Sequence, residues 1–133
     1  MPGVNNIPVT ARNVSEGFWV ITGNTRHGNL SRDLDHAINA NTTVVILMGM
    51  SKLAEIAGIY SAAGKGETPA AIIQNGTLPT QKMGVGNVAD LLEIAAKHDL
   101  HNPAILVIGE VVRFNDAFQS LQSKVSEKLK MAV

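Results

Sequence analysis

The sequence predicts an α/β fold, in the form of a single layered α/β/α domain with a mostly parallel (mixed) sheet of about five strands. Two observations carry this prediction. Short apolar runs rich in valine and isoleucine recur along the chain, as in strands that are buried on both faces. Between these runs lie segments in which apolar residues recur at the spacing of an amphipathic helix. The alternation of the two patterns is typical of a sheet covered by helices.

A first strand and a first helix are expected near the N-terminus. Phe18–Thr22 is an apolar run that starts with aromatic residues and stops at Gly23. After a polar loop, Ser31 is placed to cap a short helix that ends at Asn41. Because a helix joins this strand to the next one, we expect the two strands to run parallel to each other.

The clearest pattern is a β-α-β unit over residues 42–77. The apolar run Thr43–Leu47 is followed by a loop in which Ser51 can cap a helix. This helix carries one apolar stripe, made of Leu53, Ile56, Ala57 and Tyr60. Gly64-Lys65-Gly66 ends the helix, and the next buried strand covers Ala70–Ile73.

This unit also predicts where a ligand binds. Parallel strands place the loops that follow them, Met48–Ser51 and Asn75–Thr77, at one edge of the sheet. In open α/β sheets, ligands bind in the crevice beyond the carboxyl ends of the strands. We therefore expect any small-molecule site of this chain to lie between these two loops.

Two more strands and two more helices follow. A thinner strand is expected over Gln81–Val85, and Asn87 can cap the next helix, whose apolar stripe comprises Val88, Leu91, Leu92 and Ala95. Ala104–Ile108 is a fully apolar strand, and Val111-Val112 is expected to continue extended. A last helix begins at Asn115 and has one apolar face, made of Phe118, Leu121, Val125 and Leu129.

Composition limits the class of protein. The chain has 133 residues, of which 45% are hydrophobic, and this suits one domain with a sizeable core. Its 11 basic and 11 acidic residues cancel, so neither a nucleic acid nor a membrane surface is an expected partner. Cysteine is absent, which excludes disulfides and thiolate metal sites. Without a signal peptide or an apolar run long enough to span a membrane, a cytoplasmic domain is expected.

The residues by themselves indicate a ligand crevice and no catalytic machinery. His98 and His101 have a spacing that a metal site can use, but no third ligand is near in sequence, so a solvated helix end is the favoured interpretation. Gly84-Val85-Gly86 lacks the third glycine of a dinucleotide-binding loop. No nucleophile–base pair or paired carboxylate stands out. Catalytic residues therefore stay unknown, and no metal is expected.

Four motifs, in a fixed order and at fixed separations, carry a resemblance to a known family. They are IPVTARNVSEGFWVITG, VVILMGMSKLAEIA, ETPAAIIQNGTLPTQK and NPAILVIGEVV. Together they cover about Ile7 to Phe114. This stretch resembles the tetrapyrrole methylase family, in the C-terminal half of its members that act on uroporphyrinogen III. The resemblance implies an α/β enzyme of two domains, with S-adenosylmethionine or its product S-adenosylhomocysteine bound in the cleft between them.

The activity implied by the resemblance is methylation of uroporphyrinogen III at two ring carbons, which gives precorrin-2 for the synthesis of sirohaem and cobalamin. A homodimer in the cytoplasm, with a tetrapyrrole as substrate, is also implied. Two alternatives stay open. In the first, the chain is a non-catalytic binding or dimerisation domain. In the second, it is a methylase of the same fold that acts on another corrin intermediate.

The resemblance also implies four site residues. Met48 from the family's Met-Gly loop, Gly76 from its Asn-Gly-Thr loop and Ala104 at the start of the last core strand are implied to contact the cofactor. Arg12, which follows the Pro-Val-Thr motif, is implied to lie near the bound tetrapyrrole. Each also has a purely structural alternative: a core methionine, a turn glycine, a packing alanine and a surface charge.

The chain departs from the family pattern in two respects. Residues usual in the family are replaced at Ala11, Asn24, Leu47 and Gln74, which weakens the assignment of the substrate more than that of the cofactor. The family's N-terminal domain, with its glycine-rich loop, has no counterpart in this sequence. We therefore expect residues 1–16 to be a remnant of the interdomain region, 17–113 the C-terminal methylase domain and 114–133 a C-terminal helix. Such a fragment is expected to be inactive alone and to need the missing N-terminal domain as its partner.

Overall fold

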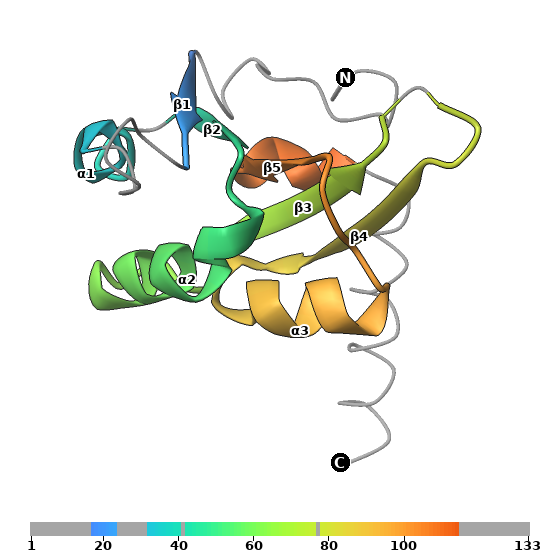
Figure 1. The fold of residues 1–133 in the computed structure, drawn as a ribbon. Coiled ribbons are helices and arrows are strands. Elements are labelled where there is room, and N and C mark those ends of the chain that lie inside the picture. Colours follow the sequence, from blue (N-terminus) through green and yellow to red (C-terminus); the bar gives the residue numbers. More distant parts are fainter. Residues whose placement is uncertain (1–16, 24–31, 41, 77, 115–133) are drawn as a thin grey trace.

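The computed structural model describes residues 17–23, 32–40, 42–76 and 78–114. Within these residues, one five-stranded sheet has the strand order β1-β2-β5-β3-β4 (Figure 1). The strands are β1 (Phe18–Thr22), β2 (Thr43–Leu47), β3 (Pro69–Gln74), β4 (Lys82–Asn87) and β5 (Ala104–Ile108). The prediction of one mixed sheet of about five strands is confirmed, and the ranges of β1, β2 and β5 are those expected from their apolar runs.

The pairing of the strands differs from the expected, mostly parallel arrangement. In the described sheet, β1 and β2 pair in parallel as predicted, whereas the other three pairs of neighbours are antiparallel. The reason is the position of β5, which lies between β2 and β3 and runs against both. Val107 of β5, for example, lies opposite Val45 of β2 and Ala71 of β3. Consequently β1, β2 and β3 still run in one direction, although β2 and β3 are not neighbours.

Helices cover one face of this sheet. In Figure 1, α2 (Leu53–Ala62) and α3 (Leu91–Lys97) lie side by side beneath the strands, and the short α1 (Asp33–Ala37) lies next to β1. The side chains between the two layers form the main core, which includes Leu34, Ile46, Ile56, Ile72, Leu91 and Leu106. Burial of each such side chain stabilises the fold by about 1.5–3 kcal/mol. This core therefore fixes the sheet on which the loops of the pocket are mounted.

The longer helices begin with a 3₁₀ turn and without a capping side chain. The turns are η2 (Met50–Lys52) before α2 and η3 (Val88–Asp90) before α3. The predicted caps are therefore wrong: Ser51 lies inside η2, and Asn87 makes no capping hydrogen bond with its side chain. The backbone closes the first turn instead, since the nitrogen of Lys52 donates to the oxygen of Gly49 at 2.9 Å. Ser31 and Asn41, expected to bound α1, lie outside the described residues.

The buried face of α3 is also shifted from the predicted stripe. Leu91 is buried as predicted, but Leu92 is 57% exposed and Ile94 is buried in its place. Two glycines of β4 explain the shift, because a Cβ added at Gly84 or Gly86 would come within 2.7 or 2.9 Å of the Ile94 side chain. The glycines let α3 approach β4 closely, and Ile94 fills the space above them.

The opposite face of the sheet carries a smaller apolar cluster. Val111 and Val112 belong to η4 (Glu110–Phe114) and pack against Ala71, Ile73 and Val107. The expectation that these valines continue an extended chain is wrong, because the nitrogen of Val112 donates to the oxygen of Gly109 and closes a turn. The helix expected from Asn115 onward, which would extend the third layer, lies outside the described residues.

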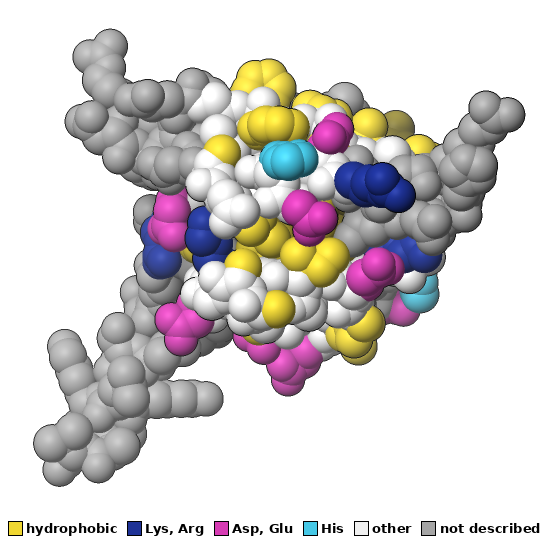
Figure 2. Space-filling view, turned by 90° about the vertical axis from the view of Figure 1, so that its left-hand side faces the viewer, with side chains coloured by type: hydrophobic (Ala, Val, Ile, Leu, Met, Phe, Trp, Pro, Cys, Tyr) yellow, Lys and Arg dark blue, Asp and Glu magenta, His cyan; other side chains and the backbone are white. Residues whose placement is uncertain are grey.

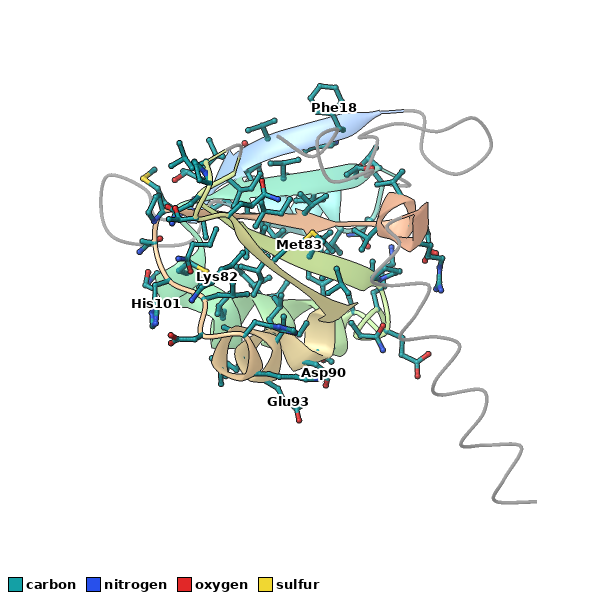
Figure 3. The ribbon with its side chains drawn as sticks, turned by 90° about the vertical axis from the view of Figure 1, so that its right-hand side faces the viewer. Phe18, Lys82, Met83, Asp90, Glu93 and His101 are labelled. Carbon is teal, nitrogen blue, oxygen red and sulfur yellow. The ribbon has the colours of Figure 1, made fainter. Side chains whose placement is uncertain are left out.

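The surface of the described part carries apolar side chains near β1. Phe18 and Val20 are 53% and 54% exposed, and Figure 3 shows Phe18 on the outer side of the sheet, away from the helices. In Figure 2, hydrophobic side chains gather along the upper edge of the described surface, above scattered charged groups. No helix among the described residues has the length and apolar character needed to cross a membrane.

Candidate functional site

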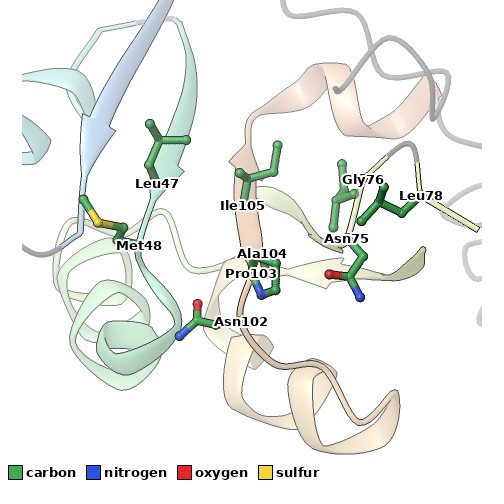
Figure 4. A pocket seen from close by; sticks show the side chains of 10 residues that line it. Leu47, Met48, Asn75, Gly76, Leu78, Asn102, Pro103, Ala104 and Ile105 are labelled. Carbon is green, nitrogen blue, oxygen red and sulfur yellow. The ribbon is translucent and has the colours of Figure 1, made fainter. Parts of the chain in front are cut away.

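A cavity of about 540 Å³ opens where β2 and β3 end and β5 begins (Figure 4). Because β2 and β3 run in the same direction, the loops after them lie at this edge of the sheet, as the sequence predicted. The lining is drawn from these two loops, the adjoining strands and the segment before β5: Leu47, Met48, Ile73, Asn75, Gly76, Leu78, Asn102, Pro103, Ala104 and Ile105.

The loop after β2 holds Met48 in an unusual conformation. Its φ of 56° lies in the left-handed region, which non-glycine residues rarely adopt, and the side chain remains 57% exposed. Gly49 packs tightly beneath it, since an added Cβ would come within 2.9 Å of two core side chains. The nitrogen of Gly23 donates to the oxygen of Leu47 at 2.7 Å and ties the end of β1 to this loop. A strained residue with an exposed apolar side chain is typical of a binding loop.

The loop after β3 presents a second residue in the left-handed region. Asn75 has a φ of 52°, which asparagine tolerates better than most residues. Its nitrogen donates to the oxygen of Pro103 at 2.9 Å, and its oxygen accepts from the nitrogen of Leu78 at 3.0 Å. These bonds fix the turn against the segment that leads into β5, and Gly76 follows at the wall of the cavity.

The cavity has apolar walls and no charged side chain among its described lining residues. Ile73 and Ile105 belong to the cluster on the sheet face opposite the helices, so the cavity extends from the strand edge onto that face. Its polar side chains are the amides of Asn75 and Asn102, which Figure 4 shows at the lower rim. Such a lining suits a ligand with flat apolar surfaces and a few hydrogen-bonding groups.

The structure brings three predicted site residues to this one cavity. Met48 comes from the end of β2, Gly76 from the loop after β3 and Ala104 from the first position of β5. Arg12, the fourth predicted site residue, lies outside the described residues. The three that are described therefore share one potential ligand, although their roles stay a prediction.

Two polar lining residues, Asn75 and Asn102, were not among the site residues predicted from the sequence. Asn75 carried a usable signal, because it directly precedes Gly76 in the loop that had been singled out. Asn102 opens the motif that contains Ala104, but its place at the cavity depends on the insertion of β5 between β2 and β3. Both add hydrogen-bonding groups to a wall that is otherwise apolar.

Ionisable groups gather beside the cavity. His101 Nε2 lies 2.7 Å from Asp99 Oδ1, and Lys82 Nζ lies 3.9 Å from Asp99 Oδ2. The hydrogen bond and the charge of His101, together with the charge of Lys82, lower the pKa of Asp99. All three side chains are exposed, so these pairs contribute little to stability. Within the described residues, no group of three histidine, aspartate or glutamate side chains could hold a metal ion.

Residues 2–92 of the chain match the model of the family described as Tetrapyrrole (Corrin/Porphyrin) Methylases. The uroporphyrinogen-III C-methyltransferase of Pseudomonas aeruginosa is 39% identical over 108 residues, and that of Methanocaldococcus jannaschii is 36% identical over 120 residues. The matches cover 80% and 88% of this chain but 44% and 49% of the two relatives. The chain thus spans less than half the length of either relative.

A solved structure gives the same picture of the fold. The uroporphyrin-III C-methyl transferase from Thermus thermophilus, complexed with S-adenyl homocysteine, is similar with a TM-score of 0.69 and 26% sequence identity. The similarity covers 80% of this chain and 48% of that one. The resemblance seen in the sequence motifs is thereby confirmed, in both sequence and fold.

Proposed function

We propose that the residues around this cavity form one wall of a binding site for S-adenosylmethionine. The reason is that the chain belongs to the tetrapyrrole (corrin/porphyrin) methylase family. The observation that carries this proposal is the meeting of Met48, Gly76 and Ala104 at a single cavity. The loops of Met48 and Gly76 were expected at one edge of the sheet, and the insertion of β5 between β2 and β3 brings Ala104 to the same edge. Their convergence supports a shared ligand.

The lining residues fit this cofactor. The apolar side chains of Leu47, Met48 and Ile73 suit the faces of a purine and a sulfur-linked chain, and the amides of Asn75 and Asn102 offer hydrogen-bond donors and acceptors. A volume of about 540 Å³ lies within the usual range for ligand sites. The bound cofactor would supply an activated methyl group, while the residues of this chain would orient it and exclude water from one side.

The reaction we propose is methylation of uroporphyrinogen III at two ring carbons, which gives precorrin-2. The names of both relatives and of the Thermus protein support this substrate. Methyl transfer needs the carbon nucleophile held in line with the methyl group, in a site closed to water. Because Leu47 and Met48 stay exposed at the rim, we propose that a second domain, of the kind that longer relatives contain, closes the site over them.

The proposed organisation follows from this two-walled site. Residues 17–113 form the cofactor-binding domain, and residues 1–16 lead to the second wall and place Arg12 near the tetrapyrrole. We propose a C-terminal helix over residues 114–133. We also propose that the protein acts in the cytoplasm as a homodimer, and the exposed Phe18 and Val20 on β1 support the dimer.

Calorimetric titration of the chain with S-adenosylhomocysteine tests the cofactor site. The unmodified chain is expected to bind, and Gly76→Val is expected to weaken binding by about tenfold or more, because it adds a branched side chain at a glycine that lines the cavity. Gly58→Val is the matched control, since a Cβ at this position on α2 meets nothing within 4 Å. Absence of binding by the unmodified chain would contradict the proposal.

A further inference from the structure

Gln74, the last residue of β3, makes a contact across the rim of the cavity. Its Oε1 accepts a hydrogen bond from the backbone nitrogen of His101 at 2.5 Å. In the register of the sheet, Gln74 lies between Lys82 of β4 and Ala104 of β5. Gln74 is only half-buried and is not one of the lining residues of the cavity, so this side chain is placed to hold the wall rather than to touch a ligand.

The wall that Gln74 holds is the segment between α3 and β5, residues 98–103. This segment turns at Asp99, whose φ is 52°, and is anchored to the core by Leu100, which is 3% exposed. Beyond His101 it forms the lining at Asn102 and Pro103. The positions of Asn102 and Pro103 therefore depend on the contacts that hold the segment beyond the buried Leu100.

Two bonds fix it to the end of β3. Gln74 holds the backbone of His101 with its side chain, and Asn75 holds Pro103 through the bond from its backbone nitrogen, at 2.9 Å. Gln74, at the end of β3, and Asn75, the next residue, thus hold His101 and Pro103, on either side of Asn102. The bond from Asn75 needs no particular side chain, whereas the bond to Gln74 depends on one carboxamide oxygen.

The charged side chains near this contact are exposed. Asp99 pairs with His101 through its side chain, at 2.7 Å, and with Lys82 at 3.9 Å. Figure 3 shows Lys82 and His101 at the same end of the sheet. Because these side chains are at least half exposed, solvent screens their attraction. The bond to Gln74 is exposed as well, but unlike the ion pairs it holds the backbone of the segment directly.

We propose that Gln74 is a positioning residue of the cofactor site, which sets the distance between the loop after β3 and the segment 98–103 and thereby the width of the cavity. This inference rests on the proposed function, because the ligand for which the width matters is S-adenosylmethionine. The contact needs only an acceptor oxygen at this position. Glutamate should therefore replace Gln74, whereas methionine, which has a similar length and no such acceptor, should not.

Calorimetric titration of the variants with S-adenosylhomocysteine tests this proposal. Gln74→Met is expected to weaken binding by about three- to tenfold, the effect of one lost hydrogen bond. Gln74→Glu is expected to stay within about twofold of the unmodified chain, because it keeps the acceptor. Asp99→Asn is the matched control, since it removes the charge of the exposed ion pairs, tolerates the left-handed backbone at this position and leaves the bond to the His101 backbone in place.

A second readout separates positioning from a general loss of stability. In ¹H–¹⁵N spectra, the amide proton of His101 should move upfield in Gln74→Met and return in Gln74→Glu, at similar melting temperatures. If the unmodified chain does not bind S-adenosylhomocysteine, the proposed function is overturned and this inference with it. If it binds and Gln74→Met binds equally well, or if both variants lose affinity equally, only the role of Gln74 is overturned.

Discussion

At the scale of single residues, the loop after β2 combines local strain with an exposed methionine. Met48 has a φ of 56°, and a non-glycine residue in this region costs about 1 kcal/mol relative to glycine. The side chain is 57% exposed, so its removal forfeits little buried surface. We predict that Met48→Gly raises the free energy of unfolding, measured by urea denaturation, by about 1 kcal/mol and weakens the binding of S-adenosylhomocysteine.

Met48→Ala is the matched control for this prediction. It removes the same side chain but keeps the cost of the left-handed conformation, so it should weaken binding without any gain in stability. If the two variants unfold at the same urea concentration, strain at Met48 does not limit the stability of the fold.

Also at this scale, part of the lining of the cavity was predictable from local motifs, while the roles of its residues stay a prediction. Met48, Gly76 and Ala104 were each found from their immediate neighbours in the sequence. The contact of Gln74 with His101 was not, because it joins residues 27 positions apart. A bond of this kind depends on which strands are neighbours, and periodicity along the chain carries no information on that order.

At the scale of elements, α3 gives a direct test of which of its faces is buried. Ile94 lies over Gly84 and Gly86 of β4 and is buried, whereas Leu92 is 57% exposed. We predict that Ile94→Ala lowers the free energy of unfolding by about 2–4 kcal/mol, since it leaves a cavity that the backbone of β4 cannot fill. Leu92→Ala, the control on the same helix, should change it by less than about 0.5 kcal/mol. Equal costs in urea denaturation would mean that the helix is rotated from this arrangement.

The elements themselves were largely predictable, because β1, β2, β3 and β5 are short apolar runs and each longer helix is a periodic one. Their order in the sheet was not. The fully apolar run Ala104–Ile108 indicated burial on both faces, which the central β5 confirms, but burial alone does not fix the direction of a strand. The glycines of β4 weakened the apolar pattern of Gln81–Val85 in the sequence. They are needed there because a side chain at Gly84 or Gly86 would clash with Ile94.

At the scale of the whole molecule, we expect the outward face of β1 to form part of the interface of the proposed homodimer. Among the described residues, β1 is an edge strand, and its outward Phe18 and Val20 are more than half exposed. In a two-fold interface the same patch meets its own copy, so one substitution acts twice. We predict that sedimentation equilibrium gives about twice the chain mass of 14.1 kDa, and that Val20→Lys shifts the protein toward the monomer because two like charges would be buried together. Leu92→Lys, at an equally exposed leucine on α3, should leave the mass unchanged. A monomeric unmodified chain, or a Val20→Lys variant that dimerises as well as Leu92→Lys, would remove β1 from the interface.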